Sequence, residues 1–268
     1  MENISIHETA IVDPKAKISP GVKIGPYAII GPDVVIGDHT VIGNHVVVTG
    51  QTKLGMNCKI YTGAVVGSPP QDKKHSADDN VFLNIGDNNV IREYVTINPG
   101  TVDGGSQTVL GNNNWIMAYC HIAHDCIIGN NCIMANNASL AGHVVVEDNV
   151  VIAGFGAVHQ FTRLGRLSMI GGCSKVPQDL PPFCLCDGHP AKVIGLNTVG
   201  LKRAGISSET LTLLKQAVRI LFRSGLAKKT ALEKIERELK LVPELQHLVF
   251  FAKTSKRGML SGAHAGEE

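Results

Sequence analysis

Aliphatic residues recur at every sixth position over most of this chain. Isoleucine, valine, leucine or methionine holds that position without exception in three series, which cover residues 6–66, 85–97 and 110–176. A spacing of six fits neither the 3.6-residue turn of an α-helix nor the two-residue alternation of a long strand. Three hexads make one triangular coil of short strands, so the pattern predicts a parallel β-helix with coils of 18 residues.

Two further positions of the hexad carry information. The residue after the aliphatic one is often glycine, as at Gly25, Gly37 and Gly111, which predicts tight turns with unusual backbone angles. The fourth residue after it is small or β-branched and is predicted to be a second inward position. Three cysteines that resemble a metal ladder fall on this position, so we expect buried core residues instead: Cys120, Cys126 and Cys132.

The repeat is interrupted twice and then ends. Residues about 68–84 and about 98–109 are polar or rich in proline and glycine, which predicts two inserted loops. After residue 176 the pattern becomes helical. Ser207 is a candidate N-cap and Gly225 a stop for a first helix, Thr230 and Glu233 form a capping box for a second, and Pro243 opens a third. The tail from Gly258 is expected to be frayed. We therefore predict a β-helical domain over residues 1–189 and a small α-helical C-terminal domain over residues 190–268.

Composition and charge narrow the class of protein. The chain has 44% hydrophobic and 18% charged residues, which excludes a disordered protein, and no apolar run approaches the roughly 20 residues of a transmembrane helix. An odd total of seven cysteines and no secretory signal predict a reduced, cytoplasmic compartment. Residues 190–268 hold 14 Lys and Arg against 7 Asp and Glu, whereas residues 1–189 hold 11 against 16. Such a basic C-terminal part indicates an acidic partner, namely nucleic acid, an anionic membrane or an acidic protein, or else a solvated helical face.

Histidines gather on one outer edge of the predicted coil. His121 and His124 flank an inward isoleucine, and a step of 18 residues places position 142 above position 124, with His143 and then His159 on the following coils. Three interpretations apply to this column: exposed polar residues on turns, a zinc site, or proton transfer by a histidine beside a carboxylate. We favour proton transfer, because Asp125 follows His124 directly and neighbouring amides could receive an anion.

At these residues the sequence resembles the left-handed hexapeptide-repeat acyltransferases and, within them, the UDP-N-acetylglucosamine O-acyltransferases. The resemblance covers essentially the whole chain. The most specific stretches are residues 121–126 (HIAHDC), 135–143 (ANNASLAGH), 157–161 (AVHQF), 171–174 (GGCS) and 200–203 (GLKR). The resemblance implies a mainly β fold, a left-handed parallel β-helix of hexapeptide repeats followed by a small α-helical domain.

The family's reaction assigns roles to residues of this chain. The resemblance implies transfer of an (R)-3-hydroxyacyl group from acyl carrier protein to the 3-hydroxyl of UDP-N-acetylglucosamine, the first step of lipid A biosynthesis, with no metal or other cofactor. It makes His124 the general base, Asp125 its orienting carboxylate and the Gly142 amide the oxyanion donor. The implied contacts to the sugar, diphosphate and nucleotide are Asp72, Lys74, His121, His143, His159, Gln160, Asn197 and Arg203, and Gly172 matches the acyl-chain ruler, with room for about 14 carbons.

The resemblance also implies partners. It predicts a homotrimer with the cleft between neighbouring β-helices, so that one site takes His124 from one chain and His159 or Arg203 from another. Acyl carrier protein is strongly acidic, which would explain the basic C-terminal part, and no nucleic acid partner is implied. The sequence departs from the family at Asn98 and Pro99, where His-Arg is common, and at Val199 and Ala204, which replace polar or charged residues.

Other functions on the same scaffold remain open. The acceptor could be the 3-amino sugar analogue, or the donor acetyl-coenzyme A. A zinc enzyme of the γ-carbonic-anhydrase kind would share the fold and the histidines. A structural or ice-binding solenoid would need a flat, regular exterior face, whereas the exterior positions here are irregular.

Overall fold

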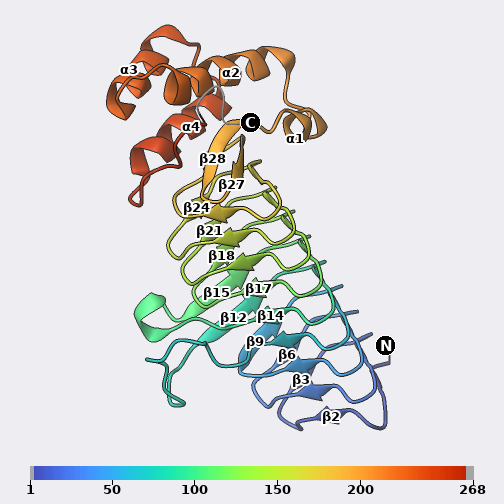
Figure 1. The fold of residues 1–268 in the computed structure, drawn as a ribbon. Helices are drawn as coiled ribbons and strands as arrows, with labels where there is room; N and C mark the ends of the chain where they lie inside the picture. Colours follow the sequence, from blue (N-terminus) through green and yellow to red (C-terminus); the bar gives the residue numbers. More distant parts are fainter. Residues whose placement is uncertain (1–2, 264–268) are drawn as a thin grey trace.

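The hexapeptide pattern folds into a three-sided parallel β-helix with four helices stacked on its C-terminal end (Figure 1). This computed structural model describes residues 3–263. Strands of the three sheets alternate around the coil, so each strand of the repeat, β1 to β26, pairs in parallel with the strand one coil away, as in Lys23↔Val41 and Ile24↔Ile42. The predicted fold class, mainly β with helices at the C-terminal end, is confirmed.

The first sheet contains β1 (Ser5–Ile6), β4 (Lys23–Ile24), β7 (Val41–Ile42), β10 (Lys59–Ile60), β13 (Val90–Ile91), β16 (Trp115–Ile116), β19 (Ile133–Met134), β22 (Val151–Ile152), β25 (Met169–Ile170), β27 (Cys184–Gly188) and β28 (Ala191–Leu196). The second sheet contains β2 (Ile11–Val12), β5 (Ile29–Ile30), β8 (Val47–Val48), β11 (Val65–Val66), β14 (Thr96–Ile97), β17 (His121–Ile122), β20 (Ser139–Leu140), β23 (Ala157–Val158) and β26 (Lys175–Val176). The third contains β3 (Lys17–Ile18), β6 (Val35–Ile36), β9 (Gln51–Leu54), β12 (Phe82–Ile85), β15 (Gln107–Leu110), β18 (Ile127–Ile128), β21 (Val145–Val146) and β24 (Arg163–Leu164).

The repeating aliphatic residues form one continuous core inside the coil. From Ile24 to Val176 every one of them is buried, and each removes apolar surface worth about 1.5–3 kcal/mol. The three cysteines on the second inward position are buried as predicted. The prediction is wrong at the open end, where Ile6 is 46% exposed. Strand β1 is the outermost of its sheet, so no further coil covers this residue.

The glycines of the hexad serve a different purpose from the one predicted. Gly25, Gly37 and Gly111 do not have positive φ angles; that conformation falls two residues later, as at Tyr27 and His39. A Cβ on Gly37 would lie 2.7 Å from the Gly55 carbonyl carbon of the next coil. These glycines are therefore required by close approach of stacked backbones and not by unusual backbone angles.

The turns from the third sheet to the first carry a ladder of amide side chains. Asn112 Oδ1 accepts a hydrogen bond from the backbone N–H of Asp87. In the same way, Asn130 Oδ1 accepts from the backbone N–H of Asn112 and Asp148 Oδ1 accepts from the backbone N–H of Asn130, all at 2.7–2.8 Å. Inside it, the buried Asn114 donates to Asn89 Oδ1 at 3.0 Å. We call the turns at residues 86–89, 111–114, 129–132 and 147–150 the ladder edge. These hydrogen bonds join successive coils, so this edge helps to hold the stack together.

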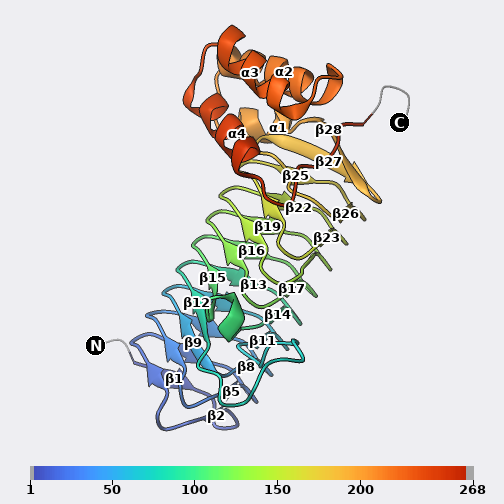
Figure 2. The same cartoon turned by 90° about the vertical axis from the view of Figure 1, so that its left-hand side faces the viewer.

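Both insertions leave the β-helix on the side that faces the viewer in Figure 2. They end earlier than predicted, because residues 82–84 and 107–109 lie in β12 and β15, which extend the third sheet beside β9. The second insertion contains a short 3-10 helix, Val102–Gly104. Asn98 is buried and its amide donates to the Ser68 and Pro69 carbonyls at 3.0 and 3.1 Å, which fastens the start of the first insertion.

The helices cover the last coil. They are α1 (Thr198–Arg203), α2 (Ser208–Arg223), α3 (Lys228–Glu238) and α4 (Pro243–Thr254). The Ser207 cap, the Gly225 stop and the Pro243 start are confirmed. The capping box is wrong, because α3 begins two residues before Thr230, and α1 was not predicted. No helix in residues 3–263 has the length and apolarity needed to cross a membrane.

The join between the two parts is a hairpin. The predicted boundary after residue 189 falls in the turn between β27 and β28, which pair antiparallel. Strand β27 also pairs in parallel with β25 of the last coil, and Val193 of β28 is buried with the β-helix core. The first sheet thus continues beyond the repeat and carries the helices on its final strand.

Candidate active site

Three consecutive turns from the second sheet to the third bring the predicted catalytic residues together. The His143 amide donates to the His124 carbonyl at 3.0 Å, and the Phe161 amide donates to the Gly142 carbonyl at 3.1 Å. Positions 124, 142 and 160 are therefore stacked one coil apart, as the 18-residue step predicts. We call residues 123–125, 141–143 and 159–161 the site edge.

His124 and Asp125 form a directed pair on this edge. His124 Nδ1 lies 2.7 Å from Asp125 Oδ2, and the carboxylate side chain is 1% exposed. A carboxylate can only accept a hydrogen bond, so the ring proton is on Nδ1 and the lone pair is on Nε2. The histidine side chain keeps 17% of its surface exposed. His124 can therefore take a proton at Nε2 while Asp125 stabilises the resulting imidazolium.

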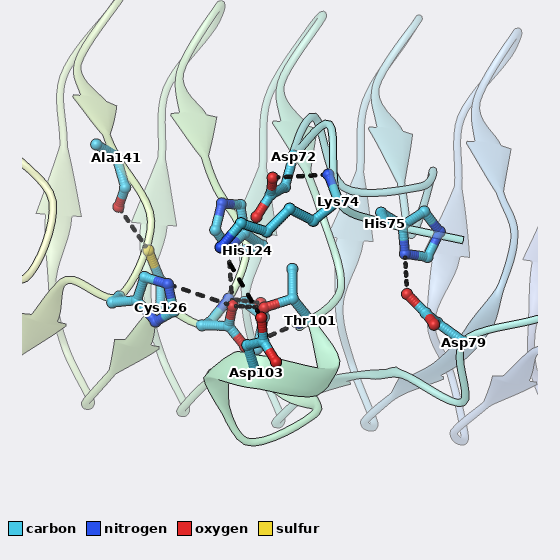
Figure 3. Close-up of polar contacts among 12 residues, drawn as sticks. Asp72, Lys74, His75, Asp79, Thr101, Asp103, His124, Cys126 and Ala141 are labelled. Atoms are coloured by element: carbon cyan, nitrogen blue, oxygen red, sulfur yellow. Dashed lines mark hydrogen bonds and ion pairs between the residues drawn. The ribbon is translucent and has the colours of Figure 1, made fainter. Parts of the chain in front are cut away.

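The second insertion holds Asp125 in place. Thr101 donates its backbone N–H to Oδ1 at 2.9 Å and its hydroxyl to Oδ2 at 2.7 Å, and the Asp125 amide donates to Thr108 Oγ1 at 2.8 Å (Figure 3). Gly104 packs on the carboxylate, since a Cβ there would lie 2.0 Å from Asp125 Cγ. The sequence reasoning missed Thr101 and Gly104 because they lie outside the repeat; the only signal was the glycine-rich insertion itself.

Gly142 lies directly against the imidazole ring of His124. A Cβ on Gly142 would lie 2.6 Å from His124 Cε1 and 2.8 Å from Nε2, so only glycine leaves room for the ring. Among the described residues, the Gly142 amide donates to no backbone carbonyl. An N–H group without an acceptor, close to a basic nitrogen, is suited to bind a developing oxyanion.

His143 and His121 flank the pair. The His143 ring meets His124 edge-on at 5.1 Å and is stacked on Phe161 at 4.4 Å, while its Nε2 lies 3.8 Å from Asp125 Oδ2. His121 Nδ1 is 2.7 Å from Thr96 Oγ1. Burial, together with the charge of His124, lowers the pKa of His121 below its ordinary value, so this ring is a neutral hydrogen-bonding group at pH 7.

The first insertion brings a cation to the same place. Figure 3 shows the Lys74 side chain extending across the front of the site toward Asp103 of the second insertion, with its Nζ 4.0 Å from Asp103 Oδ2. Both side chains are largely exposed, so this pair restrains the loops only weakly. Asp72 Oδ1 accepts from the Lys74 amide at 3.0 Å, which shapes the loop tip. Lys74 is therefore free to pair with an incoming anion.

The remaining predicted residues lie farther from His124. His159 and Gln160 are exposed on the next turn of the site edge, within the same chain. Asn197 is 6% exposed and caps α1, accepting from Gly200 and donating to the Leu167 carbonyl, so its proposed nucleotide contact would require that cap to open. Arg203 and Ala204 are exposed at the end of α1, and Val199 is 61% exposed at its start.

Gly172 lies on a different edge. It is exposed in the turn from the first sheet to the second, and a Cβ there would meet only the Gly154 carbonyl oxygen at 3.6 Å. The position therefore has room for an added side chain. Within one chain, Gly172 and His124 therefore lie on two different edges of the β-helix, on either side of the second sheet.

One group of side chains offers metal ligands. Within the described part of the chain, ligand atoms of His124, Asp125 and His143 lie within 4.8 Å of one another. Both carboxylate oxygens of Asp125 already accept from Thr101, and Oδ2 also accepts from His124 Nδ1. A metal bound by all three residues would have to replace these hydrogen bonds. The arrangement fits acid–base chemistry better than a metal centre.

Comparison with known proteins finds matches to both parts of the chain. The family model "Bacterial transferase hexapeptide (six repeats)" matches residues 3–37, 33–68 and 107–142, and "Udp N-acetylglucosamine O-acyltransferase; Domain 2" matches residues 179–260. The chain is 50% identical over 254 residues to an acyl-[acyl-carrier-protein]–UDP-N-acetylglucosamine O-acyltransferase of Myxococcus xanthus, covering 95% of this chain and 98% of that protein. An enzyme of the same name from Thermodesulfovibrio yellowstonii is 53% identical over 254 residues, covering 95% of this chain and 98% of that protein.

Solved structures give the same result. The chain is similar to the UDP-N-acetylglucosamine acyltransferase of Bacteroides fragilis, with a TM-score of 0.93, 39% identity, and coverage of 95% of this chain and 99% of that one. The Francisella novicida enzyme gives a TM-score of 0.94 at 38% identity, covering 97% of this chain and 95% of that one.

Proposed function

The chain belongs to the family of acyl-[acyl-carrier-protein]–UDP-N-acetylglucosamine O-acyltransferases of lipid A biosynthesis, and we propose that it carries out this reaction at the site edge with His124 as general base. The observation that carries the proposal is the His124–Asp125 pair, which leaves a basic nitrogen directed away from a fully bonded carboxylate. The acyl group is an (R)-3-hydroxyacyl chain and the acceptor is the 3-hydroxyl of the glucosamine ring.

The reaction needs one proton to move out and back. His124 Nε2 accepts the proton of the 3-hydroxyl while the oxygen attacks the thioester carbonyl carbon. Asp125 balances the positive charge on the ring through Nδ1–H. The tetrahedral intermediate then breaks its carbon–sulfur bond, and the thiolate of the carrier leaves with the proton that His124 returns. The product is the O-acylated sugar nucleotide, and the enzyme regains its starting state.

The Gly142 amide stabilises the intermediate. Negative charge develops on the former thioester oxygen, and an N–H group held by the stacked backbone can bond to it without reorganisation. Removing one such donor typically costs about 10²–10³ in rate.

The diphosphate requires donors and positive charge. Lys74, His121 and His143 supply them around His124, and Arg203 adds a charged guanidinium from α1. His159 and Gln160 extend the same edge by one turn and contact the sugar nucleotide there. Acyl carrier protein docks on the basic C-terminal part, and the enzyme acts in the cytoplasm.

We place the complete site between subunits of a homotrimer. His124 and the Gly172 ruler lie on two different edges of the β-helix, and a second copy of the chain would bring these two edges together across a cleft. His159 lies on the edge of His124 within one chain, so the residues expected from a neighbour are Gly172 and Arg203. Gly172 leaves room for a chain of about 14 carbons.

Mass spectrometry of UDP-N-acetylglucosamine incubated with the protein and (R)-3-hydroxyacyl carrier proteins of different chain length tests this proposal. Acylated product that is lost in His124→Ala supports the reaction and the base. Product only with acetyl-coenzyme A, or only with the 3-amino sugar, would overturn the donor or the acceptor. Zinc bound at near-unit stoichiometry and required for activity would overturn the metal-free mechanism.

A further inference from the structure

The segment that follows α4 turns back onto the last coil of the β-helix. Ser255 Oγ donates to Asp179 Oδ2 at 2.8 Å, and the Asp179 amide donates to the Gly258 carbonyl at 2.9 Å. Leu260 is 2% exposed and belongs to the main core. Residues 258–263 are thus packed and paired with residues about 70–80 positions earlier in the chain, which contradicts the expected frayed tail over this range; residues 264–268 lie outside the described part of the chain.

This segment carries a guanidinium to the site edge. Arg257 Nε donates to the Pro177 carbonyl at 2.7 Å, which fixes the direction of the side chain. Its Nη2 lies 2.9 Å from His159 Nδ1. Arg257 is therefore anchored at one nitrogen and directed at a histidine with another.

Two neighbours of His159 require opposite tautomers. A guanidinium only donates, so the contact with Arg257 requires an unprotonated Nδ1 and places the proton of a neutral ring on Nε2. The Gln160 carbonyl lies 3.2 Å from the same Nδ1 and only accepts, so it would favour a proton on Nδ1. The contact with Arg257 is shorter and involves a charged donor, so it outweighs the other.

We propose that Arg257 is a positioning residue that selects the Nε2–H tautomer of His159 and so presents an N–H donor to the anionic diphosphate of the sugar nucleotide. The proposal rests on the role given above to His159. With the other tautomer, Nε2 would present a lone pair to the phosphate oxygens, and the contact would be repulsive. A hydrogen bond to a charged group is strong enough that its loss should weaken binding about 10- to 100-fold.

The tautomer can be measured without any activity assay. Solid-state ¹⁵N NMR of protein labelled at histidine, near pH 8 where ordinary imidazoles are neutral, distinguishes a protonated from an unprotonated Nδ1, and His159→Gln identifies the signal by its loss. We expect an unprotonated Nδ1 in the wild type and a shift toward Nδ1–H in Arg257→Met, with the proton donated to the Gln160 carbonyl. Lys256→Met, which removes a charge from the exposed neighbouring residue, is the matched control and should leave the signal unchanged.

Kinetics test the consequence for binding. Arg257→Met should raise the KM for UDP-N-acetylglucosamine about 10-fold or more with kcat and thermal unfolding nearly unchanged. Arg257→Lys keeps a donor and should recover part of the loss, and Arg257→Met should have no further effect in a His159→Gln background. A protonated Nδ1 in the wild type, or an unchanged KM in Arg257→Met despite a changed tautomer, would overturn the inference. Absence of acylated product from the wild type would instead overturn the proposed function, whereas the NMR result would still stand on its own.

Discussion

Two edges of the same β-helix use polar residues in opposite ways. On the ladder edge, the side-chain oxygens of Asn112, Asn130 and Asp148 each accept a hydrogen bond from a backbone N–H of the preceding coil. On the site edge, the Nε2 atom of His124 and the amide of Gly142 take no part in such a ladder, and His159 and Gln160 are exposed. Both edges are turns of one hexapeptide repeat with the same backbone register.

The difference shows how a repeat protein gains a function without changing its fold. Polar groups that bond to neighbouring coils add stability and leave nothing for a ligand. His124 is held at Nδ1 by Asp125, which the second insertion fixes in place, and its Nε2 atom stays available. The insertion replaces the ladder as the support of the site edge. Changes on the two edges should therefore separate activity from stability.

The largest effect is expected for His124→Ala. Loss of the general base should reduce kcat by about 10²–10⁴, while the unfolding temperature should stay close to that of the wild type because no coil-to-coil bond is removed. Product formation followed by mass spectrometry and thermal unfolding measure the two effects. His45→Ala, which removes an exposed histidine from a turn of another edge, is the control and should remain active; equal losses in both variants would contradict the assignment.

Gly142→Ala should have the next largest effect. The added Cβ would lie within 2.8 Å of His124 Nε2, so the ring must move, and a displacement near 1 Å at a reacting group can cost about 10²-fold. We expect kcat to fall and folding to be retained. At Gly195 a Cβ would meet nothing within 4 Å, so Gly195→Ala should be neutral. If Gly142→Ala had wild-type kcat, neither the ring position nor the oxyanion role of this turn would hold.

On the ladder edge, Asn114→Ala should show the reverse pattern. Asn114 is 1% exposed, donates to Asn89 Oδ1 and the Gly129 carbonyl, and accepts from the Cys132 amide. Its removal leaves buried groups without partners, which should lower the free energy of unfolding by about 2–4 kcal/mol. Denaturant unfolding gives this value, and activity per folded molecule should be unchanged. A loss of activity without a loss of stability would remove the distinction between the two edges.

Two buried thiols, one beside each edge, give a comparison that depends on pH. Burial raises the pKa of Cys126, next to the site edge, to about 12, and that of Cys132, on the ladder edge, to about 11. The folded state therefore favours the neutral thiol, so this stabilisation is present below the unfolded pKa near 9 and is lost as the pH rises toward 11–12. Each thiol contributes about 1.4 kcal/mol per pH unit in that window.

Alkylation rates compare the accessibility of the thiols beside the two edges. Exposed Cys173 should react quickly with iodoacetamide, whereas Cys126 and Cys132 should both react slowly and at similar rates until the protein unfolds. Peptide mass spectrometry after timed labelling resolves the three sites. Faster labelling of Cys126 would show that the site edge opens locally while the ladder edge stays closed.

The sequence predicts the features that repeat. The hexad register placed Cys126 in the core and Gly142 beside His124, because a fixed period converts a position in the chain into a position in space. It also predicted the start of α4 at Pro243, where a local backbone restriction sets the boundary. These features depend on nearest neighbours, either in sequence or one coil away.

Features that depend on irregular, distant contacts were not predictable in this way. Thr101 reaches Asp125 across 24 positions from an insertion with no period, and Arg257 reaches His159 across 98. Helix α3 begins after Ala227 with no side-chain cap, so its start is set by packing of Leu232 and Ile235 and not by a capping residue. In each case the tertiary partner, and not the local sequence, determines the outcome.

The uncovered first coil gives the molecule a direction of unfolding. Helices close one end, while at the other the inward residue Ile6 is 46% exposed and β1 has a single neighbour. In a stack stabilised by adjacent contacts, coils are lost from the weaker end inward. Amide protons of β1 and β2 should exchange with solvent well before those of β17 and β20. A molecule that has lost its first coils would therefore still carry an intact His124–Asp125 pair.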